Sequence, residues 1–537
     1  MVLGVYLGVL PLPAVPTNSG RQAVELRLED YINLVLENNE SVQAQMLEAE
    51  VNRRKSRAEY GAFEPEWVSS VTREINNRQN NTEQAASLGG VSELKERNTI
   101  YDSGIESLIP TGAKIRLGST LSDLNNNVPP SAFLSSSNGN VFFKQYQTFV
   151  GVTVTQPLLK NAGGNATLAN IRIAAMDSDI AFQEYRRQLM LTISQAEAAY
   201  WNLYLAQEQV RFFDESVSVA ETILADSQER LKAGQGSELD VLEARSGLAL
   251  RHTKQNDAIQ NSYEALARLQ SLYGAAPLRE GMTIRAVDAP GITKAMPAYY
   301  QRFQLAFDLN PDYLIQLKKV DQAKVRLGLA NNQRLPEMNF RGSYGFNGLG
   351  SSPSQSFENL TGRDFLSWSA AVDLHLPLLG GIKERNIFNA AKLSLQAALV
   401  NLNGVQTQIS HALNLAMLKA QNRTESVHNY ETVVHFNEDL LKTELARLNV
   451  GKVEARKVLE VEADLLDTRQ SLADVLVQYE RALLEAQLAE GSILQSRKLE
   501  LTRDELQKKT MALLKSHKLP TEVFRPVPNT PANRPEN

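Results

Sequence analysis

The residues that could carry out chemistry are few and scattered along the chain. The 537 residues include no cysteine and six histidines, and no phosphate-binding loop, G-x-S-x-G or H-E-x-x-H motif occurs among them. His428 and His435 lie seven positions apart on one face of a predicted helix, but no carboxylates accompany them in a metal-binding pattern. The sequence therefore predicts no enzyme, no metal site and no cofactor, and the lack of cysteine excludes disulfides.

Charged residues gather instead around a stretch that occurs twice. Residues 230–244 (RLKAGQGSELDVLEA) and 447–461 (RLNVGKVEARKVLEV) match at six of fifteen positions, at a constant offset of 217. Each copy contains a glycine just after a long apolar-periodic segment, and glycine past the last helical turn is the usual helix stop. Ser237 and Asp240 then have the spacing of a capping box for the next helix. Both stretches are predicted to be tips of long helical hairpins.

The segments on either side of the tips have coiled-coil periodicity. Before the first tip, apolar residues from Phe182 onward follow one another mostly at steps of three and four. A helix over about 166–232 would be roughly 100 Å long at about 1.5 Å per residue, and a return helix is predicted over 239–273. The second hairpin is predicted to consist of a helix over about 383–449 and a return helix that continues to about 513.

Alternating stretches precede each hairpin and predict β-strands. They lie within about 67–156 in the first half of the chain and within about 338–376 in the second. Such half-polar strands fit a small antiparallel sheet in water, and they also fit an outer-membrane β-barrel, where lipid-facing and lumen-facing residues alternate. In a barrel, Lys114, Arg116 and Arg341 are expected to face the lumen, because a charge facing lipid is costly near mid-membrane.

The order of strands and hairpin occurs twice, so the chain is predicted to have two repeats. The first spans 28–274 and begins with a helix pair or one kinked helix; the second spans 300–513. A Pro/Gly-rich connector over 275–299 separates them, and the Pro-rich tail over 514–537 is predicted to be disordered. The segment 1–27 fits the remnant of a secretory signal as well as a merely apolar N-terminus.

The two repeats differ in length. Their offset is 271 at the first strand and 217 at the tips, so the first repeat carries 54 additional residues. This extra length falls in the 77–142 region, which has the pattern of an added hairpin with longer loops.

Overall composition narrows the classes of partner. The formal net charge of −5 provides no basic surface, so nucleic acid is not an expected partner. The sequence contains no run of about 18 apolar residues, so it predicts no transmembrane helix. The apolar seams of four long helices cannot all be buried within one chain, whereas a ring of several copies would bury them and pair the sheet edges.

The duplicated tips, the Gln156-Pro157 and Leu376-Pro377 strand ends and the internal duplication resemble the TolC family of outer-membrane channel proteins, over about 28–491. The resemblance implies a mainly α fold with β: two tandem repeats of strands plus a long coiled-coil helical hairpin. It implies a homotrimer whose outer-membrane β-barrel, surrounded by lipid, continues into a periplasmic α-helical barrel. It also implies four strands per chain, to which the 97–122 hairpin would add two.

The function implied by this resemblance is that of a passive conduit in a Gram-negative-type cell. The channel would belong to a tripartite export system for small-molecule efflux or type I protein secretion. A periplasmic adaptor (membrane fusion) protein and an inner-membrane transporter would open it at its periplasmic tips. The alternative is a periplasmic coiled-coil adaptor, which would normally contain one hairpin flanked by β-sandwich half-motifs.

The resemblance also assigns roles at the tips. In the family, acidic residues on the inner helices line a constriction there; Asp240 occupies one aspartate position, Lys457 replaces the other, and Glu243 and Glu460 lie three residues further on. These four residues are gate candidates. The alternative is that they are solvated charges on a helix surface, each of little energetic value, because the sequence pattern is the same in both cases. The candidates for adaptor docking are Leu231, Ala233, Gly234, Leu448, Val450 and Gly451.

Overall fold

The computed structural model describes residues 23–88, 90–128, 142–274, 283–292, 299–378 and 380–516. Most of the predicted signal remnant, most of the predicted connector and nearly all of the predicted tail lie outside these residues. The chain divides into two compact units. A helical unit comprises Met1–Glu48, Phe182–Leu314 and Val405–Asn537, and a sheet unit comprises Ala49–Ala181 and Ile315–Gly404.

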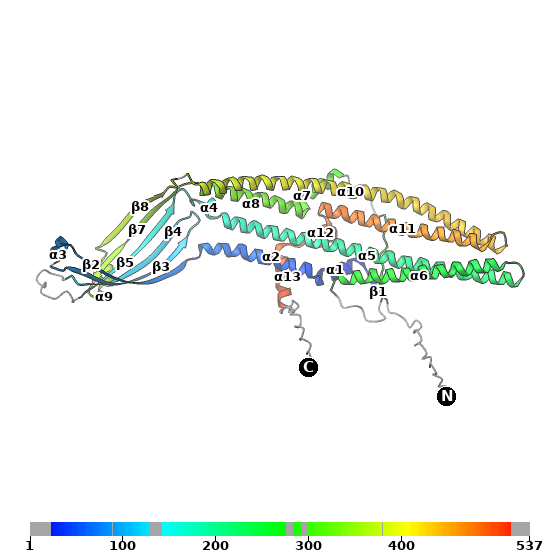
Figure 1. Ribbon diagram of the computed structural model, residues 1–537, viewed down its shortest axis with the longest axis horizontal. Helices are drawn as coiled ribbons and strands as arrows, with labels where there is room; N and C mark the ends of the chain where they lie inside the picture. Colours follow the sequence, from blue (N-terminus) through cyan, green and yellow to red (C-terminus); the bar gives the residue numbers. More distant parts are fainter. Residues whose placement is uncertain are drawn as a thin grey trace, which may run out of the picture. The chain divides into compact units, whose positions relative to one another are not determined.

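The elements follow one another twice in the predicted order (Figure 1). The first repeat contains α1 (Leu28–Asn38), α2 (Glu40–Ala58), β2 (Glu66–Gln79), α3 (Thr82–Ser87), β3 (Glu93–Leu108), β4 (Lys114–Asn126), β5 (Phe143–Pro157), α4 (Gly164–Thr167), α5 (Ala169–Lys232) and α6 (Glu238–Ser271). The second contains α7 (Tyr299–Leu309), α8 (Pro311–Gln333), β7 (Glu337–Gly350), α9 (Pro353–Thr361), β8 (Leu366–His375), α10 (Ile382–Asn449) and α11 (Ala455–Glu490). Two short helices follow, α12 (Ile493–Ser496) and α13 (Arg503–Lys515).

The sheet unit is built on one six-stranded antiparallel sheet in the order β2-β3-β4-β5-β7-β8. Its strands are longer than the sequence predicts, because polar segments expected to be loops continue the ladder. Gln79 pairs with Glu93 at the end of β2 and β3, and the Asn76 amide donates to the Glu96 carboxylate at 3.0 Å. The hairpin β3–β4 is therefore a full part of the sheet.

The helical unit is held together by seams of small side chains between its helices. Leu413, Ala416 and Ala486 form one buried cluster between α10 and α11, and Ala420, Tyr479 and Ala482 form the next. Alanine at these positions lets the two backbones approach closely, as in other coiled-coil contacts. Among the described residues, no helix combines the length and apolarity needed to cross a membrane.

The return helix α11 ends earlier than predicted. The sequence pattern suggested a helix to about 513, but α11 stops at Glu490 because Gly491 adopts a φ of +86°. A Cβ at this glycine would lie 2.6 Å from the backbone nitrogen of Asn310. The close approach of the α7–α8 junction therefore requires glycine here, and glycine ends the helix.

A short parallel pair of strands, β1 (Ala23–Leu26) and β6 (Thr283–Ala286), packs against α5 in the helical unit. The Tyr200 hydroxyl donates to the carbonyl of Leu26 at 2.9 Å and accepts the backbone N–H groups of Val287 and Asp288, each at 3.1 Å. Burial raises the pKa of Tyr200 to about 12, so this hydroxyl stays protonated and able to donate.

Two carboxyl groups with raised pKa values lie in the same unit. Glu197 of α5 accepts two hydrogen bonds from Arg497, at 2.9 and 2.7 Å, and Glu480 of α11 accepts the N–H of Gly291 at 3.4 Å. Burial raises the pKa of Glu197 above its usual range, although Arg497 opposes the shift. Burial likewise raises the pKa of Glu480, and the charge of Glu197 adds to the shift.

We predict that Glu197→Gln flattens the pH dependence of stability. A carboxyl whose folded-state pKa is raised stabilises the fold when protonated, and this contribution is lost as the pH rises from the unfolded-state value toward the raised one. Thermal unfolding of the purified protein between pH 4.5 and 7, followed by circular dichroism, should show a smaller decline for the variant. An unchanged decline would contradict this assignment, and Glu425→Gln, at an exposed position of α10, is the control.

Candidate functional site

One face of the sheet is apolar across all six strands and exposed. Trp67, Ile105, Leu117, Val152, Tyr344 and Trp368 form one row that crosses the whole sheet. Trp67 is 75% exposed and Trp368 is 70% exposed, although residues of this type are normally buried. Other exposed members of this face are Val71, Ile75, Tyr101, Val150, Phe340, Leu366, Val372 and Leu374. An apolar surface of this extent marks a site of contact with lipid or protein.

The opposite face is mostly polar and contains the three predicted lumen residues. Arg116 forms ion pairs with Asp102 and with Glu106, the latter at 3.2 Å, and Arg341 pairs with Asp373 at 2.5 Å. Lys114 lies two positions from Arg116 on the same side of β4. Charged residues also occur on the apolar side. Arg73 shares that side with Val71 and Ile75 and is exposed, and Arg97, Asp123 and Lys144 lie on it nearer the strand ends.

A row of glycines crosses the polar face. Gly104, Gly118, Gly151 and Gly345 stand opposite one another on four neighbouring strands. The Arg116 side chain lies over the first two, with Nε 3.1 Å from where a Cβ of Gly104 would be, and the Phe149 ring lies 2.7 Å from the corresponding positions of Gly151 and Gly345. The row thus lets a long cation and an aromatic ring lie flat against the backbone.

Helix α9 covers the end of the apolar face that is farther from the α4–α5 segment. Ser356 of α9 is fully buried and its hydroxyl lies 2.5 Å from that of Thr148 on β5. Gly348 on β7 makes room for the helix, because a Cβ there would lie 1.9 Å from the Ser356 carbonyl oxygen. The exposed apolar band therefore ends beneath α9.

The hairpin tips have the same backbone structure in both repeats, as predicted. Gly234 and Gly451 have φ values of +72° and +71°. The N–H after each glycine bonds back to the carbonyl of the repeated arginine, at 2.8 Å for Arg230 and 3.0 Å for Arg447. This is the pattern of a Schellman C-cap, which requires the left-handed conformation at the glycine.

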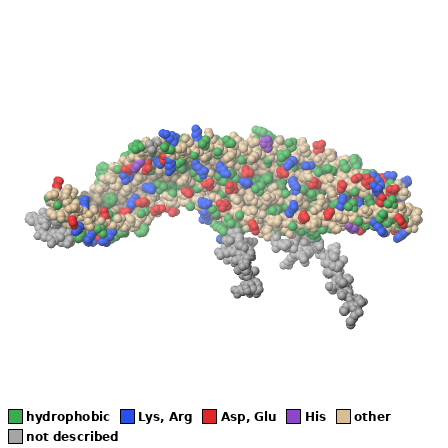
Figure 2. All heavy atoms as spheres, viewed as in Figure 1, with side chains coloured by type: hydrophobic (Ala, Val, Ile, Leu, Met, Phe, Trp, Pro, Cys, Tyr) green, Lys and Arg blue, Asp and Glu red, His purple; other side chains and the backbone are tan. Residues whose placement is uncertain are grey.

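The gate candidates are placed differently at the two tips. Asp240 accepts the Ser237 N–H at 2.9 Å, which completes the predicted capping box of α6. Glu243 lies 4.0 Å from Arg456 of the other hairpin. Lys457 and Glu460 form an exposed pair within α11 at 3.1 Å. Figure 2 shows basic and acidic side chains intermingled at this end of the hairpins.

The docking candidates differ in exposure. Val450 is 66% exposed, Ala233, Gly234 and Gly451 are exposed and Leu231 is half-buried. Leu448 is 6% exposed and packs in a core cluster with Val458 and Leu459, so its side chain supports the tip from within. The candidates chosen from the sequence did not include Leu239 and Leu242, which are 60% and 64% exposed.

A buried ion pair joins the two hairpins a few turns from the tips. Arg251 of α6 pairs with Glu462 of α11, and both side chains are less than a tenth exposed. Arg251 also donates to the Ser216 hydroxyl of α5 and the Leu459 carbonyl, each at 3.0 Å. The partners are 211 residues apart in the chain, so no local sequence pattern predicts the contact. Arg230 adds a second link by donating to the Leu448 carbonyl.

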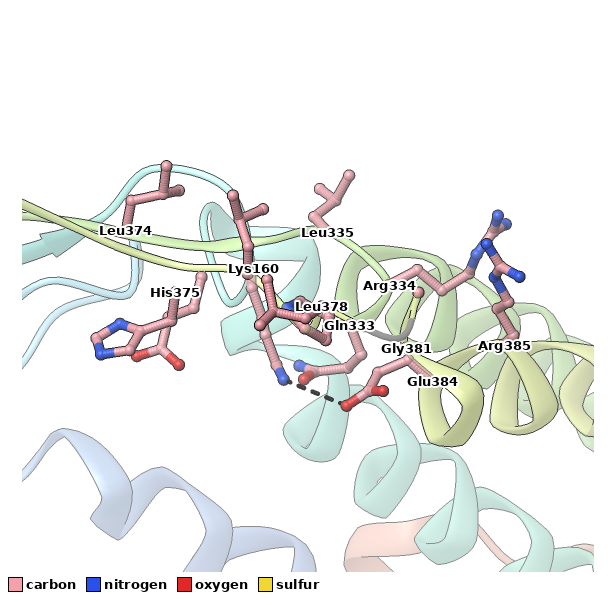
Figure 3. A pocket seen from close by; sticks show the side chains of 14 residues that line it. Lys160, Gln333, Arg334, Leu335, Leu374, His375, Leu378, Gly381, Glu384 and Arg385 are labelled. Carbon is pink, nitrogen blue, oxygen red and sulfur yellow. Dashed lines mark ion pairs between the residues drawn. The ribbon is translucent and has the colours of Figure 1, made fainter.

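A polar pocket of about 710 Å³ lies in the sheet unit, where β7 and β8 meet α8 and α10. Lys160 points toward Glu384 across it, with the charged atoms 3.9 Å apart, and Arg334 and Arg385 run alongside each other at one side (Figure 3). His375 lies directly opposite Glu337 in the β7–β8 ladder, and both residues line the pocket. Within the described part of the chain, no group of three His, Cys, Asp or Glu residues could hold a metal ion.

An exposed apolar sheet face, a polar opposite face and paired long hairpins are the features of membrane channels built from strands and helices. The family model of the outer membrane efflux protein matches residues 131–275 and 303–491. The chain belongs to this family, and it is an outer-membrane protein of an efflux system.

Solved structures share the fold at low sequence identity. The outer membrane channel CmeC of Campylobacter jejuni is 14% identical, with 90% of this chain and 88% of that chain covered and a TM-score of 0.58. VceC, an outer membrane protein of Vibrio cholerae, is 14% identical, with 86% and 96% covered and a TM-score of 0.58. The open-state channel MtrE of Neisseria gonorrhoeae is 15% identical, with 87% and 89% covered and a TM-score of 0.56. No curated protein matches the chain.

We predict that breaking the Arg251–Glu462 pair destabilises the hairpins strongly. Arg251→Met or Glu462→Leu alone should each lower the free energy of unfolding by about 3–5 kcal/mol, because each leaves an uncompensated buried charge. The double variant should lose much less than the sum. Chemical denaturation followed by circular dichroism measures this coupling.

The exposed pair Lys419–Glu485, with side chains 45% and 52% exposed, provides the control. Lys419→Met should change the free energy of unfolding by no more than about 1 kcal/mol. Strictly additive losses in the Arg251 and Glu462 cycle would show that the two side chains act independently.

Proposed function

We propose that three copies of the chain form a closed conduit for small-molecule efflux. The observation that carries the proposal is the sheet: one face is apolar and exposed, and the edge strands β2 and β8 each pair on one side only among the described residues. Lipid around the outside of a closed barrel satisfies the apolar face, and pairing between copies satisfies both edges. A channel that works in this way needs no chemistry of its own.

The hairpins form the periplasmic part of this conduit, and their tips form its mouth. Their apolar surface supports an assembly of several chains: Leu239, Leu242 and Val450 remain exposed in the single chain. A periplasmic adaptor protein docks at the tips, next to Leu231, Ala233, Gly234 and Gly451, and an inner-membrane transporter supplies the substrate. Leu448 contributes by holding the second tip in shape.

The gate consists of charged side chains at the mouth. Asp240 uses one carboxylate oxygen for its cap and keeps the other for neighbours, whereas Lys457 and Glu460 are exposed and pair with each other along their own helix. In a ring of three copies these groups meet their equivalents across a narrow opening. Lys457 then pairs with Asp240 or Glu243 of a neighbouring copy and closes the mouth by attraction between opposite charges.

The alternative function is that of a periplasmic adaptor, a binding protein and not a channel. Adaptors work in water, and the sheet of this chain presents Trp67, Tyr344 and Trp368 together on one exposed face. The cost of exposing such a surface to water favours the channel.

We predict that Asp240→Asn combined with Glu243→Gln and Glu460→Gln loosens the closed mouth. Asparagine retains an oxygen that can accept the Ser237 N–H, so the cap of α6 should persist while the attraction to Lys457 is lost. Single-channel conductance in planar lipid bilayers should rise severalfold or lose its sensitivity to divalent cations.

Glu425→Gln on α10 removes one exposed charge away from the tips and should leave conductance unchanged. Conductance of the triple variant equal to that of the parent would remove these residues from the gate. Lack of any channel activity by the parent protein would count against the proposed function itself.

A further inference from the structure

The first repeat contains two more strands than the second. The sequence offsets equate β2 with β7 and β5 with β8, since Glu64-Pro65 corresponds to Leu335-Pro336 and Gln156-Pro157 to Leu376-Pro377. In the second repeat β7 and β8 pair directly, whereas β3 and β4 stand between β2 and β5 in the first. The hairpin β3–β4 is thus an insertion into the sheet.

The apolar face and the polar face of the sheet both continue without interruption across the inserted hairpin. Ile105 and Leu117 continue the apolar row from Trp67 to Val152, and Gly104 and Gly118 continue the glycine row on the polar face. On the polar face, Arg116 is neutralised by Asp102 and Glu106 of the same hairpin. These are the properties of barrel wall, with lipid on one side and water on the other.

The apolar band crosses the sheet at a slant, and the slant measures the tilt of the strands. On β2 the band runs from Trp67 to Ile75, and on β8 it runs from Leu374 to Leu366. The middle of the band is Val71 on β2 and Ala370 on β8. Because Trp67 and Trp368 belong to the same row, Ala370 lies about six residues along the strand from the row that contains Val71, and β2 and β8 are five strand spacings apart. At about 3.3 Å per residue and 4.8 Å per spacing, a level band requires a tilt of about 40°, within the range of membrane barrels.

We propose that three copies close an eighteen-stranded barrel in which each β3–β4 hairpin is part of the wall. This inference rests on the trimer of the proposed function and replaces the four strands per chain that the family resemblance implies. At a tilt of about 40°, eighteen strands enclose a barrel about 36 Å across between backbones, compared with about 24 Å for twelve. The insertion therefore widens the exit through the outer membrane by about half.

The slant also fixes how neighbouring copies pair. Extending it by one strand past β8 places Val71 of the next copy beside Val372 or Ala370, because apolar side chains must stay on the lipid side and a one-residue slip would reverse every face. On the lumen side, Thr72 of one copy then lies beside Ala371 or Ser369 of its neighbour.

Since the chain has no cysteine, single cysteines test whether the hairpin lies in the wall. Ser122→Cys is on the polar face of β4 and Leu117→Cys on the apolar face. In proteoliposomes, a charged, water-soluble maleimide should label Ser122→Cys at least tenfold faster than Leu117→Cys. A fluorophore attached to Leu117→Cys before reconstitution should be quenched by brominated acyl chains, and the same fluorophore on Ser122→Cys should not.

Paired cysteines test closure between copies. Thr72→Cys combined with Ala371→Cys or with Ser369→Cys should give disulfide-linked oligomers up to a trimer in at least one of the two combinations. Thr72→Cys with Val372→Cys is the control: its side chains lie on opposite faces and should not cross-link.

The outcomes separate this inference from the proposed function. If both β4 cysteines label equally and neither fluorophore is quenched, while the protein still forms conducting trimers, the hairpin lies outside the wall and the eighteen-stranded barrel is wrong. If no oligomer and no conductance are found, the trimeric channel itself is wrong. Cross-linking of the control pair alone would overturn the predicted pairing of β2 with β8.

Discussion

The separation of apolar and polar side chains onto opposite faces of the sheet is the constraint on which the rest of the structure depends. A sheet with Trp67, Tyr344 and Trp368 exposed on one side cannot be satisfied in water by the chain alone. Lipid must cover that side, and the other side must remain hydrated for the ion pairs of Arg116 and Arg341. Both conditions are met when the edges β2 and β8 find partners in other copies.

Local chemistry made much of the fold predictable from the sequence. Gly234 and Gly451 end their helices because glycine tolerates positive φ, and the Ser237–Asp240 capping box needs only a three-residue spacing. Contacts between distant residues were not predictable in this way. Arg251 meets Glu462 only after both hairpins have folded, and Leu448 is buried because α11 folds back against it. The polar strand ends around Asn76 have no alternating hydrophobic pattern, so the sequence did not predict them as strand. Their pairing with the neighbouring strand in the structure defines them.

The two tips show how a duplicated sequence acquires unequal roles. Arg230 reaches across to the backbone of the second hairpin, whereas Arg447 stays on its own helix and pairs with Glu444 at 2.7 Å. The backbone caps are the same, so the difference comes from side chains alone. Both copies of the hairpin thus keep the same tip backbone, while the arginine of the first copy also binds the backbone of the second.

The glycine row on the polar face has a consequence for how selectivity could change over evolutionary time. At that level the wall consists of bare backbone with Arg116 and Phe149 folded flat upon it. A Cβ at Gly118 would lie 3.2 Å from Arg116 Nε and 3.0 Å from the Ser103 carbonyl oxygen, so a larger residue there would shift both the Arg116 side chain and the neighbouring strand. In the proposed trimer this change would occur three times around the barrel. A single base change in the gene would therefore alter the bore at this level, at a cost in the local pairing of the strands.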